Sequence, residues 1–254
     1  MKTKSQIPEE IINRINNIYW QYTIGPQIVR KPKDLAVLTS MSSFGKDNHN
    51  GPIGIAKCKF NNNEKITLIL LGGTQIKKGQ ATTITESKLS TKGKDNDYLD
   101  AVLKVFKEKD VIPKENPIII AGISLGGMIA QQIISKKEII DNYKIKSIIC
   151  FGTPLVKPLN RNNIRVKRFI EKGDIVPKFE SLQIKIGKNK KTREKLNIEE
   201  QILENGNYKT MLESHALSYV ENTKFDEYDF YGEKNGKNEL EILEEIKYFE
   251  APKK

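Results

Sequence analysis

A serine flanked by glycines is the group in this sequence best suited to nucleophilic chemistry. Gly122-Ile123-Ser124-Leu125-Gly126 has the form G-x-S-x-G, with the apolar run 117–121 before it and a stretch of helical spacing after it. In such a strand–turn–helix the serine stands at the apex in a strained conformation, and the residues two before and two after it must be small. The pattern therefore predicts that Ser124 is a nucleophile and that Gly122 and Gly126 are its turn glycines. The alternative is an ordinary glycine-rich turn, which could bind phosphate.

A serine hydroxyl needs an imidazole to accept its proton, and the sequence contains two histidines. His49 precedes the serine in a loop-like stretch, whereas His215 follows it. In α/β-hydrolases the chain order is serine, acid and then histidine, which selects His215 as the general base. The alternative for His215 is a purely structural place on a helix or in the core.

The imidazole in turn needs a carboxylate that fixes its tautomer. Asp174 follows the apolar run 164–170 in a turn that Pro177 closes, as expected for an acid in a loop at the end of a strand. Glu171, inside the expected strand, and Glu180, beyond the proline, are competing carboxylates. An aspartate that only caps a turn would also suit this sequence.

A tetrahedral oxyanion needs two hydrogen-bond donors. The backbone N–H of Leu125, which opens the helix behind the serine, is the first expected donor. The second is expected after an earlier strand, because the apolar run 65–71 is followed by Gly72-Gly73-Thr74. There the Thr74 N–H or hydroxyl could reach the oxyanion. A plain turn at the end of a strand is the alternative.

Strands that alternate with helices must position these groups. The apolar runs predict strands at 65–71, 117–121, 147–151 and 164–170, with helices at 97–108 and directly after the serine motif. This alternation predicts an α/β fold, the α/β-hydrolase fold, with a mainly parallel central sheet flanked by helices.

The remaining segments receive less specific expectations. Isoleucines at helical spacing predict a helix over 6–20, whereas 21–62 indicates loops with edge strands and 76–96 a long surface loop. Helical periodicity is expected around 197–204 and 238–249, and the basic stretch 185–195 is the best candidate for a mobile insert.

The composition excludes several classes of protein. The 254 residues are 37% hydrophobic and 30% charged, which is typical of a soluble globular chain with its own core. Two cysteines and two histidines exclude a disulfide framework and argue against a zinc site, so neither a cofactor nor a metal is predicted. Residues 116–135 carry no charge, but one proline and three glycines among them favour a strand, a turn and a helix over a membrane span.

The start of the chain shows no targeting segment, because Glu9, Glu10 and Arg14 interrupt any apolar region. We therefore expect a cytoplasmic protein, or one exported without a cleaved signal peptide.

The charge of the chain is strongly basic, with a formal net charge of +11. Nine acidic and five basic residues lie in 225–254, so residues 1–224 carry +15. A field of this size attracts polyanions, although lysines on solvated faces would also account for it. No zinc-finger, helix-turn-helix or RNA-platform signature is present, and no nucleic-acid partner is predicted.

Five short motifs together resemble the class 3 lipases, the fungal triacylglycerol lipase type of α/β-hydrolase. In chain order they are Gly73-Thr74, the elbow G-x-S-L-G-G at 122–127, Phe-Gly-x-Pro at 151–154, Asp-x-Val-Pro at 174–177 and His-x-x-x-Tyr at 215–219. The family usually has a histidine where this chain has Ile123, and an aromatic–arginine pair where it has Leu71-Gly72. The resemblance covers about 65–220. It implies one catalytic domain over 1–254, with 1–64 and 221–254 as extensions packed on that core.

The resemblance implies a serine carboxylic-ester hydrolase of the lipase type, which acts on acylglycerol or phospholipid esters through an acyl-enzyme. In this enzyme Ser124 attacks the ester carbonyl, His215 is base and then acid, and Asp174 orients His215. Leu125 and Thr74 stabilise the oxyanion, and no cofactor is needed.

Other functions stay open. They are an exported lipase or phospholipase effector or toxin, a catalytically dead hydrolase-like binding module, and a basic nucleic-acid-binding protein. If basic side chains between 154 and 195 rim the site, they favour peripheral contact with an anionic membrane. These are Lys157, Arg161, Arg165, Lys167, Arg168, Lys185, Lys188, Lys190, Lys191 and Arg193. The oligomeric state is left open.

Overall fold

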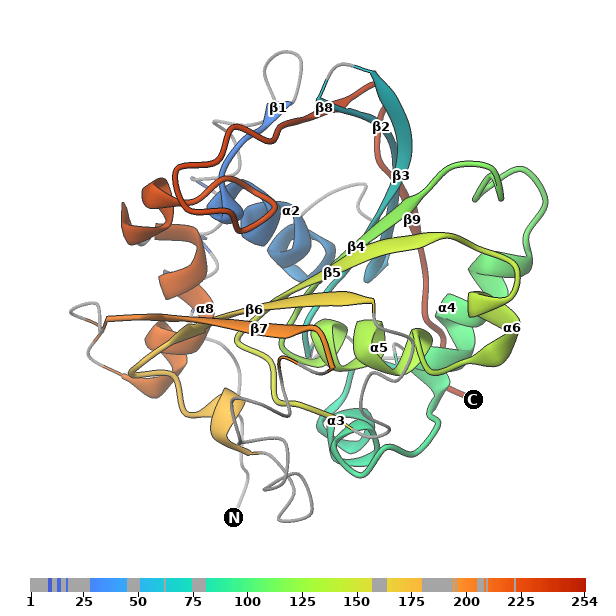
Figure 1. Cartoon of the computed structure of the whole chain (residues 1–254). Helices are drawn as coiled ribbons and strands as arrows, with labels where there is room; N and C mark the ends of the chain where they lie inside the picture. Colours follow the sequence, from blue (N-terminus) through green and yellow to red (C-terminus); the bar gives the residue numbers. More distant parts are fainter. Residues whose placement is uncertain are drawn as a thin grey trace.

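In the computed structural model the described residues form one twisted sheet of nine strands with helices on both faces (Figure 1). The structure describes residues 28–44, 51–61, 63–74, 81–156, 164–179, 196–204, 210–221 and 223–254, with a few isolated residues outside these ranges. The strands are β1 (Ile28–Val29), β2 (Ile53–Phe60), β3 (Glu64–Leu71), β4 (Ile118–Ile123), β5 (Ile145–Phe151), β6 (Arg165–Glu171), β7 (Ile198–Leu203), β8 (Leu240–Ile242) and β9 (Lys247–Phe249). The helices are α2 (Pro32–Phe44), α3 (Ile84–Thr91), α4 (Asp97–Lys107), α5 (Leu125–Ile133), α6 (Lys137–Ile140) and α8 (Met211–Glu221), with short 3-10 turns η1 (Val176–Lys178) and η3 (Thr223–Glu227).

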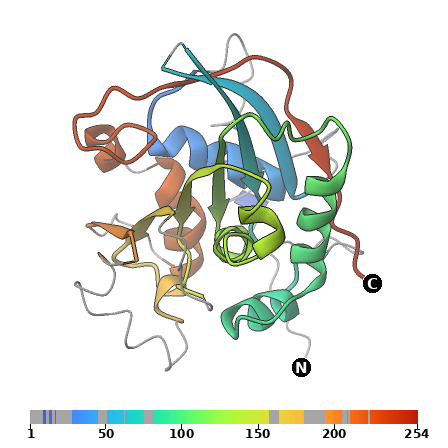
Figure 2. The same cartoon turned by 45° about the vertical axis from the view of Figure 1, so that its right-hand side comes forward.

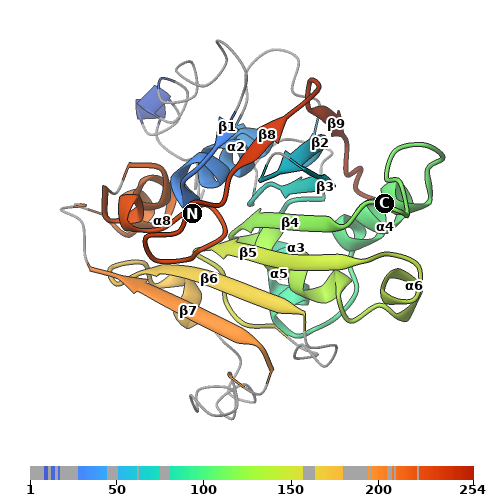
Figure 3. The same cartoon turned by 45° about the horizontal axis from the view of Figure 1, so that its top comes forward.

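The half of the sheet that carries the predicted motifs is parallel. β3, β4, β5, β6 and β7 are neighbours in that order and run the same way, as Figure 3 shows. β2 is antiparallel to β3 on the other side. The four predicted strands correspond to β3–β6, and the two predicted helices correspond to α4 and α5. The predicted α/β fold with a mainly parallel central sheet flanked by helices is therefore confirmed.

Alternating side chains of the strands build a core on each face of the sheet. Leu68, Leu70, Ile119 and Ala121 belong to the core that includes α2 and α8, and Ile69, Leu71, Ile118 and Ile120 belong to the core that includes α4 and α5. Figure 2 shows α4 and α5 together on one face of the sheet. Both faces are covered, which is why these strands are continuous apolar runs in the sequence.

The expectation of loops and edge strands over 21–62 is confirmed only for β1, which lies at the edge of the sheet, and is wrong for 32–44 and for β2. α2 begins at Pro32, and Asp34 accepts hydrogen bonds from two backbone N–H groups just before it, at 2.9 and 2.8 Å. The successive side chains of 35–38 are all buried, so the helix has no one-sided apolar pattern to reveal it. β2 is not an edge strand, because it pairs with β3 on one side and with β8 and β9 on the other.

The long loop expected over 76–96 contains a helix. α3 occupies Ile84–Thr91 and starts behind Thr83, whose Oγ1 donates to Glu86 Oε2 at 3.1 Å. A threonine followed three residues later by a glutamate is a helix-start signal that the sequence contained. The helix is polar, and apolar periodicity therefore did not indicate it. Residues 75–80 lie outside the described residues.

The helical periodicity expected around 197–204 and 238–249 is also wrong, since the structure has β7, β8 and β9 there. β7 pairs in parallel with β6, so that Glu199 lies opposite Lys167 and Glu200 opposite Arg168. These glutamates therefore form cross-strand ion pairs, and their spacing does not mark the polar face of a helix.

Several expectations fall on residues that the structure does not describe. These are His49, Glu180, the insert at 185–195 and most of the helix at 6–20. The assignment of 1–254 as one catalytic domain stays a prediction. The uncharged stretch 116–135 forms β4, a turn and α5, as predicted. Among the described residues, no helix is both long enough and apolar enough to cross a membrane.

The first turn of α5 lies very close to the ends of β3 and β4. A Cβ added at Gly126 would lie 2.1 Å from the carbonyl oxygen of Leu71 and 2.6 Å from that of Gly72. A Cβ added at Gly122 would lie 2.6 Å from backbone atoms of Gly126. Backbone atoms cannot rotate out of the way, so this approach of helix and sheet requires glycine at both positions.

We predict that Gly126→Ala lowers the free energy of unfolding by about 3 kcal/mol or more, because the new methyl group overlaps the backbone of β3. Chemical denaturation with guanidinium measures this change. Gly54→Ala in β2 is the control, since its new Cβ would meet only side-chain atoms at 3.2–3.3 Å. Its effect should be at most about 1.5 kcal/mol. Equal stability of Gly126→Ala and the parent protein would contradict the packing described here.

Candidate active site

Ser124 stands at the turn between β4 and α5 in a strained backbone conformation. Its φ of 53° and ψ of −119° lie where residues with a Cβ are rarely found. Its N–H donates to the carbonyl of Phe151 at 2.9 Å, and its own carbonyl lies 3.2 Å from Thr153 Oγ1. The end of β5 therefore holds the turn. A strained apex of this kind presents a side chain at the carboxyl edge of the sheet.

The two expected oxyanion donors lie on either side of Ser124. Leu125 is the first residue of α5, and the first N–H groups of a helix have no partner within it. On the other side, a Cβ added at Gly73 would lie 3.3 Å from Ser124 Cβ, so the loop behind β3 passes beside the serine. Thr74 follows in this loop, and its Oγ1 lies 3.1 Å from Ser87 Oγ of α3. Its hydroxyl is therefore tied to α3, and its backbone N–H is the better candidate donor.

Asp174 and His215 form a hydrogen-bonded pair with 2.8 Å between Oδ2 and Nδ1. Asp174 lies in the loop behind β6 and is fully buried, whereas His215 lies on α8 with 17% of its side chain exposed. The other carboxylate oxygen of Asp174 accepts the N–H of Val176 at 2.9 Å. A carboxylate on Nδ1 leaves Nε2 as the ring nitrogen available for proton exchange.

The end of β5 places this pair beside the serine turn. Gly152 has a φ of 57°, and a Cβ added there would lie 2.9 Å from Asp174 Oδ2 and 3.0 Å from His215 Cε1. The preceding residue, Phe151, accepts the Ser124 N–H. The end of β5 thus lies between the serine turn behind β4 and the Asp174–His215 pair. Within the described part of the chain, no hydrogen bond joins the Ser124 hydroxyl to the His215 ring, and such bonds are often long in the absence of substrate.

Glu171, the competing carboxylate, contacts a different part of α8. It is the last residue of β6, is fully buried, and accepts the hydroxyl of Ser214 at 2.5 Å. Ser214 precedes His215 on the helix, so this bond holds α8 against β6. The carboxylate bound to the imidazole is that of Asp174. The other candidates, Glu180 and His49, lie outside the described residues.

A buried arginine supports the serine turn through the segment behind β5, a role that its sequence position did not indicate. Arg168 in β6 is fully buried and donates to the carbonyl of Thr153 from Nε at 3.2 Å and from Nη2 at 2.6 Å, and from Nη1 to Glu200. Thr153 Oγ1 in turn lies 3.0 Å from the carbonyl of Phe151 and 3.2 Å from that of Ser124. The cation therefore fixes the segment that holds Ser124.

Three of the basic side chains that were expected to rim the site are engaged elsewhere in the structure. Arg168 is in the core, and Arg165 forms ion pairs with Glu199 at 3.0 Å and Glu233 at 2.7 Å. Lys167 also pairs with Glu199, at 3.3 Å. These three side chains join β6 to β7 and to the chain around Glu233. The sequence does not reveal this, because the partners come from distant segments.

Neither thiol chemistry nor a metal cluster competes for the site within the described residues. Burial raises the pKa of Cys150 in β5 to about 12, although the charge of Arg168 opposes the shift, so the thiol stays protonated at neutral pH. No group of three or more His, Cys, Asp and Glu side chains in the described ranges could hold a metal ion.

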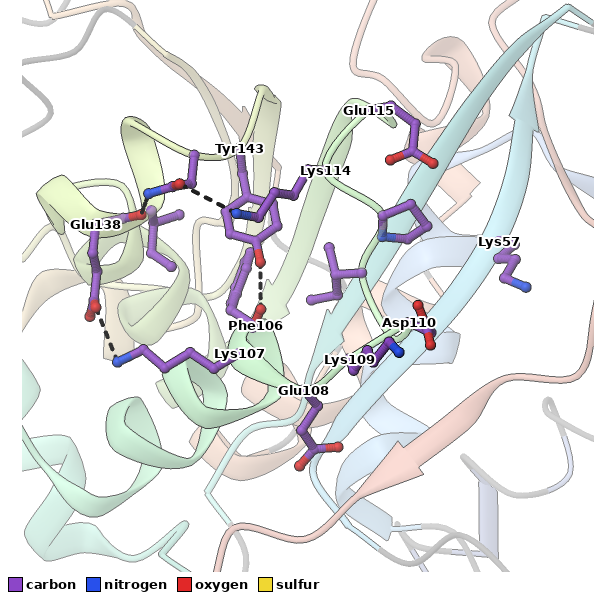
Figure 4. A pocket seen from close by; sticks show the side chains of 14 residues that line it. Lys57, Phe106, Lys107, Glu108, Lys109, Asp110, Lys114, Glu115, Glu138 and Tyr143 are labelled. Atoms are coloured by element: carbon purple, nitrogen blue, oxygen red, sulfur yellow. Dashed lines mark hydrogen bonds and ion pairs between the residues drawn. The ribbon is translucent and has the colours of Figure 1, made fainter.

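A separate depression of about 760 Å³ lies at the other edge of the sheet (Figure 4). Its lining comes mainly from 106–115, the end of α4 and the loop that leads to β4, and from 138–143, which includes most of α6 and leads to β5. Part of its charge is paired internally, with Lys107 3.1 Å from Glu138. These segments lead into the amino ends of β4 and β5, whereas Ser124 follows the carboxyl end of β4. The depression is therefore not part of the candidate active site.

One family match agrees with the fold. The family described as PGAP1-like alpha/beta domain matches residues 93–217, a segment that includes Ser124, Asp174 and His215. Among solved structures, a lipase from Rhizomucor miehei in its propeptide complex is 11% identical, with a TM-score of 0.34, and the match covers 93% of this chain and 74% of that one. A carboxylesterase from Bacillus cereus is 16% identical, with a TM-score of 0.30, over 80% of this chain and 97% of that one. No curated protein matches the sequence.

TM-scores this low do not establish a shared fold, so the fold class rests on the sheet topology and on the family match. The match falls just short of half of the chain and contains the parallel strands β4, β5 and β6 with α5. The chain therefore has an α/β fold of the hydrolase type, similar over residues 93–217 to the PGAP1-like alpha/beta domain.

Proposed function

We propose that this protein is a serine carboxylic-ester hydrolase of the lipase type. The observation that carries the proposal is the strained apex at Ser124 behind β4, close to a hydrogen-bonded Asp174–His215 pair in which Asp174 is buried. Only β5 separates β4 from β6, the strand that precedes Asp174. The motif spacing that resembles class 3 lipases supports the same assignment. A serine, a histidine and an aspartate that meet beside the carboxyl ends of β4, β5 and β6 are the parts that acyl transfer to a serine requires.

In the proposed reaction the Ser124 Oγ attacks the ester carbonyl while His215 Nε2 accepts the hydroxyl proton. The backbone N–H groups of Leu125 and Thr74 stabilise the oxyanion. The carbon–oxygen bond to the alcohol then breaks as His215 returns the proton to the leaving oxygen, which yields an acyl-enzyme. Water, deprotonated by His215, attacks the acyl carbonyl. The bond to Ser124 Oγ then breaks as His215 returns the proton to that oxygen, which releases the acid and restores the enzyme. Asp174 keeps His215 in the tautomer that these steps need.

Exposed apolar side chains support an ester with an apolar acyl part. Ile84, Phe179 and Met211 are 57%, 59% and 50% exposed. Phe179 lies in the loop behind Asp174, and Met211 is one helical turn before His215. Ile84 opens α3, whose Ser87 contacts Thr74. Apolar side chains gathered on elements around a site favour contact with an apolar ligand. Acylglycerol and phospholipid esters are equal candidates on this ground.

Peripheral contact with an anionic membrane stays a proposal from the sequence alone. Of the basic residues expected at the rim, Arg165, Lys167 and Arg168 are engaged in ion pairs. The other seven, Lys188 and Lys190 among them, lie outside the described residues.

A fluorophosphonate probe tests the nucleophile without knowledge of the substrate. We expect labelling of the peptide that contains Ser124, and hydrolysis of short- and long-chain p-nitrophenyl esters that falls roughly 10³-fold or more in Ser124→Ala. The fold should be unaffected, because only one hydroxyl is removed. Ser135→Ala, two residues beyond the end of α5, is the control and should keep full activity. An unlabelled parent protein that hydrolyses no ester would favour a binding module, and full activity in Ser124→Ala would refute the assignment.

The acid is tested by two amide substitutions of similar size. Asp174→Asn should lower kcat by about 10²–10⁴-fold, because an amide stabilises the wrong imidazole tautomer. Glu171→Gln should stay within about tenfold of the parent enzyme, since glutamine can still accept the Ser214 hydroxyl. Steady-state hydrolysis of a short soluble ester measures both variants. The opposite order of effects would transfer the role of the acid to Glu171.

A further inference from the structure

The hydroxyl of Tyr219 shares a carboxylate oxygen with the imidazole of His215. It lies 2.8 Å from Asp174 Oδ2, the same oxygen that is 2.8 Å from His215 Nδ1. Tyr219 and His215 are four residues apart on α8, which is the spacing that puts two side chains on one face of a helix. One helix therefore supplies two of the donors to the buried carboxylate.

The two hydrogen bonds of the Tyr219 hydroxyl fix the direction in which its proton points. The phenol has one proton, and its oxygen also accepts the backbone N–H of Glu171 at 3.1 Å. A carboxylate can only accept, so the phenol proton lies toward Asp174. Burial, followed by the nearby charge of Asp174, raises the pKa of Tyr219 well above its usual value. The hydroxyl therefore remains a donor at any pH at which an esterase would work.

The ring of Tyr219 is held on several sides, so the position of the hydroxyl is fixed. The side chain is fully buried, with ring centres of Phe151 and Phe225 at 6.2 and 6.3 Å. A Cβ added at Gly152 would lie 2.8 Å from its Cε2, so glycine at that position makes room for the ring. A hydroxyl held by packing can orient a carboxylate more tightly than one on a mobile side chain.

We propose that Tyr219 is a positioning residue for the reaction: its hydroxyl fixes the rotation of the Asp174 carboxylate, and thereby the imidazole of His215. This inference rests on the proposed function. The N–H of Val176 holds Oδ1 and the phenol holds Oδ2, so the carboxylate plane is defined by two donors that take no part in proton transfer. Tyr219 acts through Asp174 and does not touch the substrate.

The test compares two tyrosines that each lose a hydrogen-bonded hydroxyl. Tyr219→Phe should lower kcat about 10- to 100-fold with KM within about twofold, because it keeps the ring but removes the hydrogen bond to the charged Asp174, together with the one accepted from the Glu171 N–H. Tyr143→Phe is the matched control, since its hydroxyl donates to the carbonyl of Phe106 at 2.5 Å beside the depression at the opposite edge. Its kcat should be unchanged. An unchanged kcat in Tyr219→Phe would overturn the proposal.

A double-mutant cycle separates positioning from general stabilisation. If Tyr219 acts through Asp174, then Tyr219→Phe combined with Asp174→Asn should be no slower, within about threefold, than Asp174→Asn alone. Rates of inactivation by the fluorophosphonate report on variants that turn over too slowly. Effects that multiply in the double variant would show an independent structural role and overturn the proposal.

Two further outcomes are distinguishable. If Tyr219→Phe does not fold, 3-fluorotyrosine at position 219 keeps the ring and the hydroxyl but makes the hydroxyl a stronger donor. The fluorinated protein should then differ from the parent in kcat by at least about twofold, with KM constant. In the Asp174→Asn background the same replacement should leave kcat unchanged. Identical kcat would overturn the inference. A parent enzyme without serine labelling and without ester hydrolysis would instead refute the proposed function, from which the inference starts.

Discussion

The buried carboxylate of Asp174 is the group on which the arrangement of the carboxyl edge depends. A carboxylate without solvent is tolerated only when hydrogen-bond donors surround it. Here the donors are the N–H of Val176, the imidazole of His215 and the phenol of Tyr219. Two of the three come from α8, so the helix is in place only when the carboxylate is satisfied. The hydrogen bonds that stabilise the buried carboxylate therefore also fix the position of the imidazole.

A second buried ion supports the other side of the site. The guanidinium of Arg168 holds the carbonyl of Thr153, and the Thr153 side chain contacts the carbonyl of the strained Ser124. A strained backbone persists only where its surroundings over-determine it. The core thus contains a cation beside the serine turn, held by the end of β5 and by β7, and an anion beside the imidazole, held by its own loop and by α8.

The parallel strands β3–β6 were predictable because they form apolar runs and end in motifs with few conformational choices. Several other elements lacked such a signal. α2 is buried on several sides, α3 is polar, and the glutamates of β7 find their partners across the sheet on β6. At the site, the spacing indicated Ser124, Asp174 and His215. The burial of Arg168 could not be predicted, because a lysine- and arginine-rich sequence gives no sign of which cation lies inside. Tyr219 was visible in the sequence at helical spacing from His215, but its hydrogen bond to Asp174 depends on the loop behind β6.

The pairing of β2 has a consequence for the synthesis of the chain. β2 obtains its second neighbour only from β8 and β9, with Cys58 opposite Ile242 and Ile53 opposite Phe249. Until those late residues leave the ribosome, one side of β2 is an open strand edge, on which nascent chains can aggregate. Lys57 and Lys59 are charged side chains on this strand, and charge on an open edge opposes pairing with other chains. In the finished sheet the same lysines lie 3.1 Å from Glu244 and 3.7 Å from Glu241. The charge of Lys57 and Lys59 thus opposes aggregation at β2 while its edge is open. Once β8 has paired with β2, the same two lysines form ion pairs with Glu244 and Glu241.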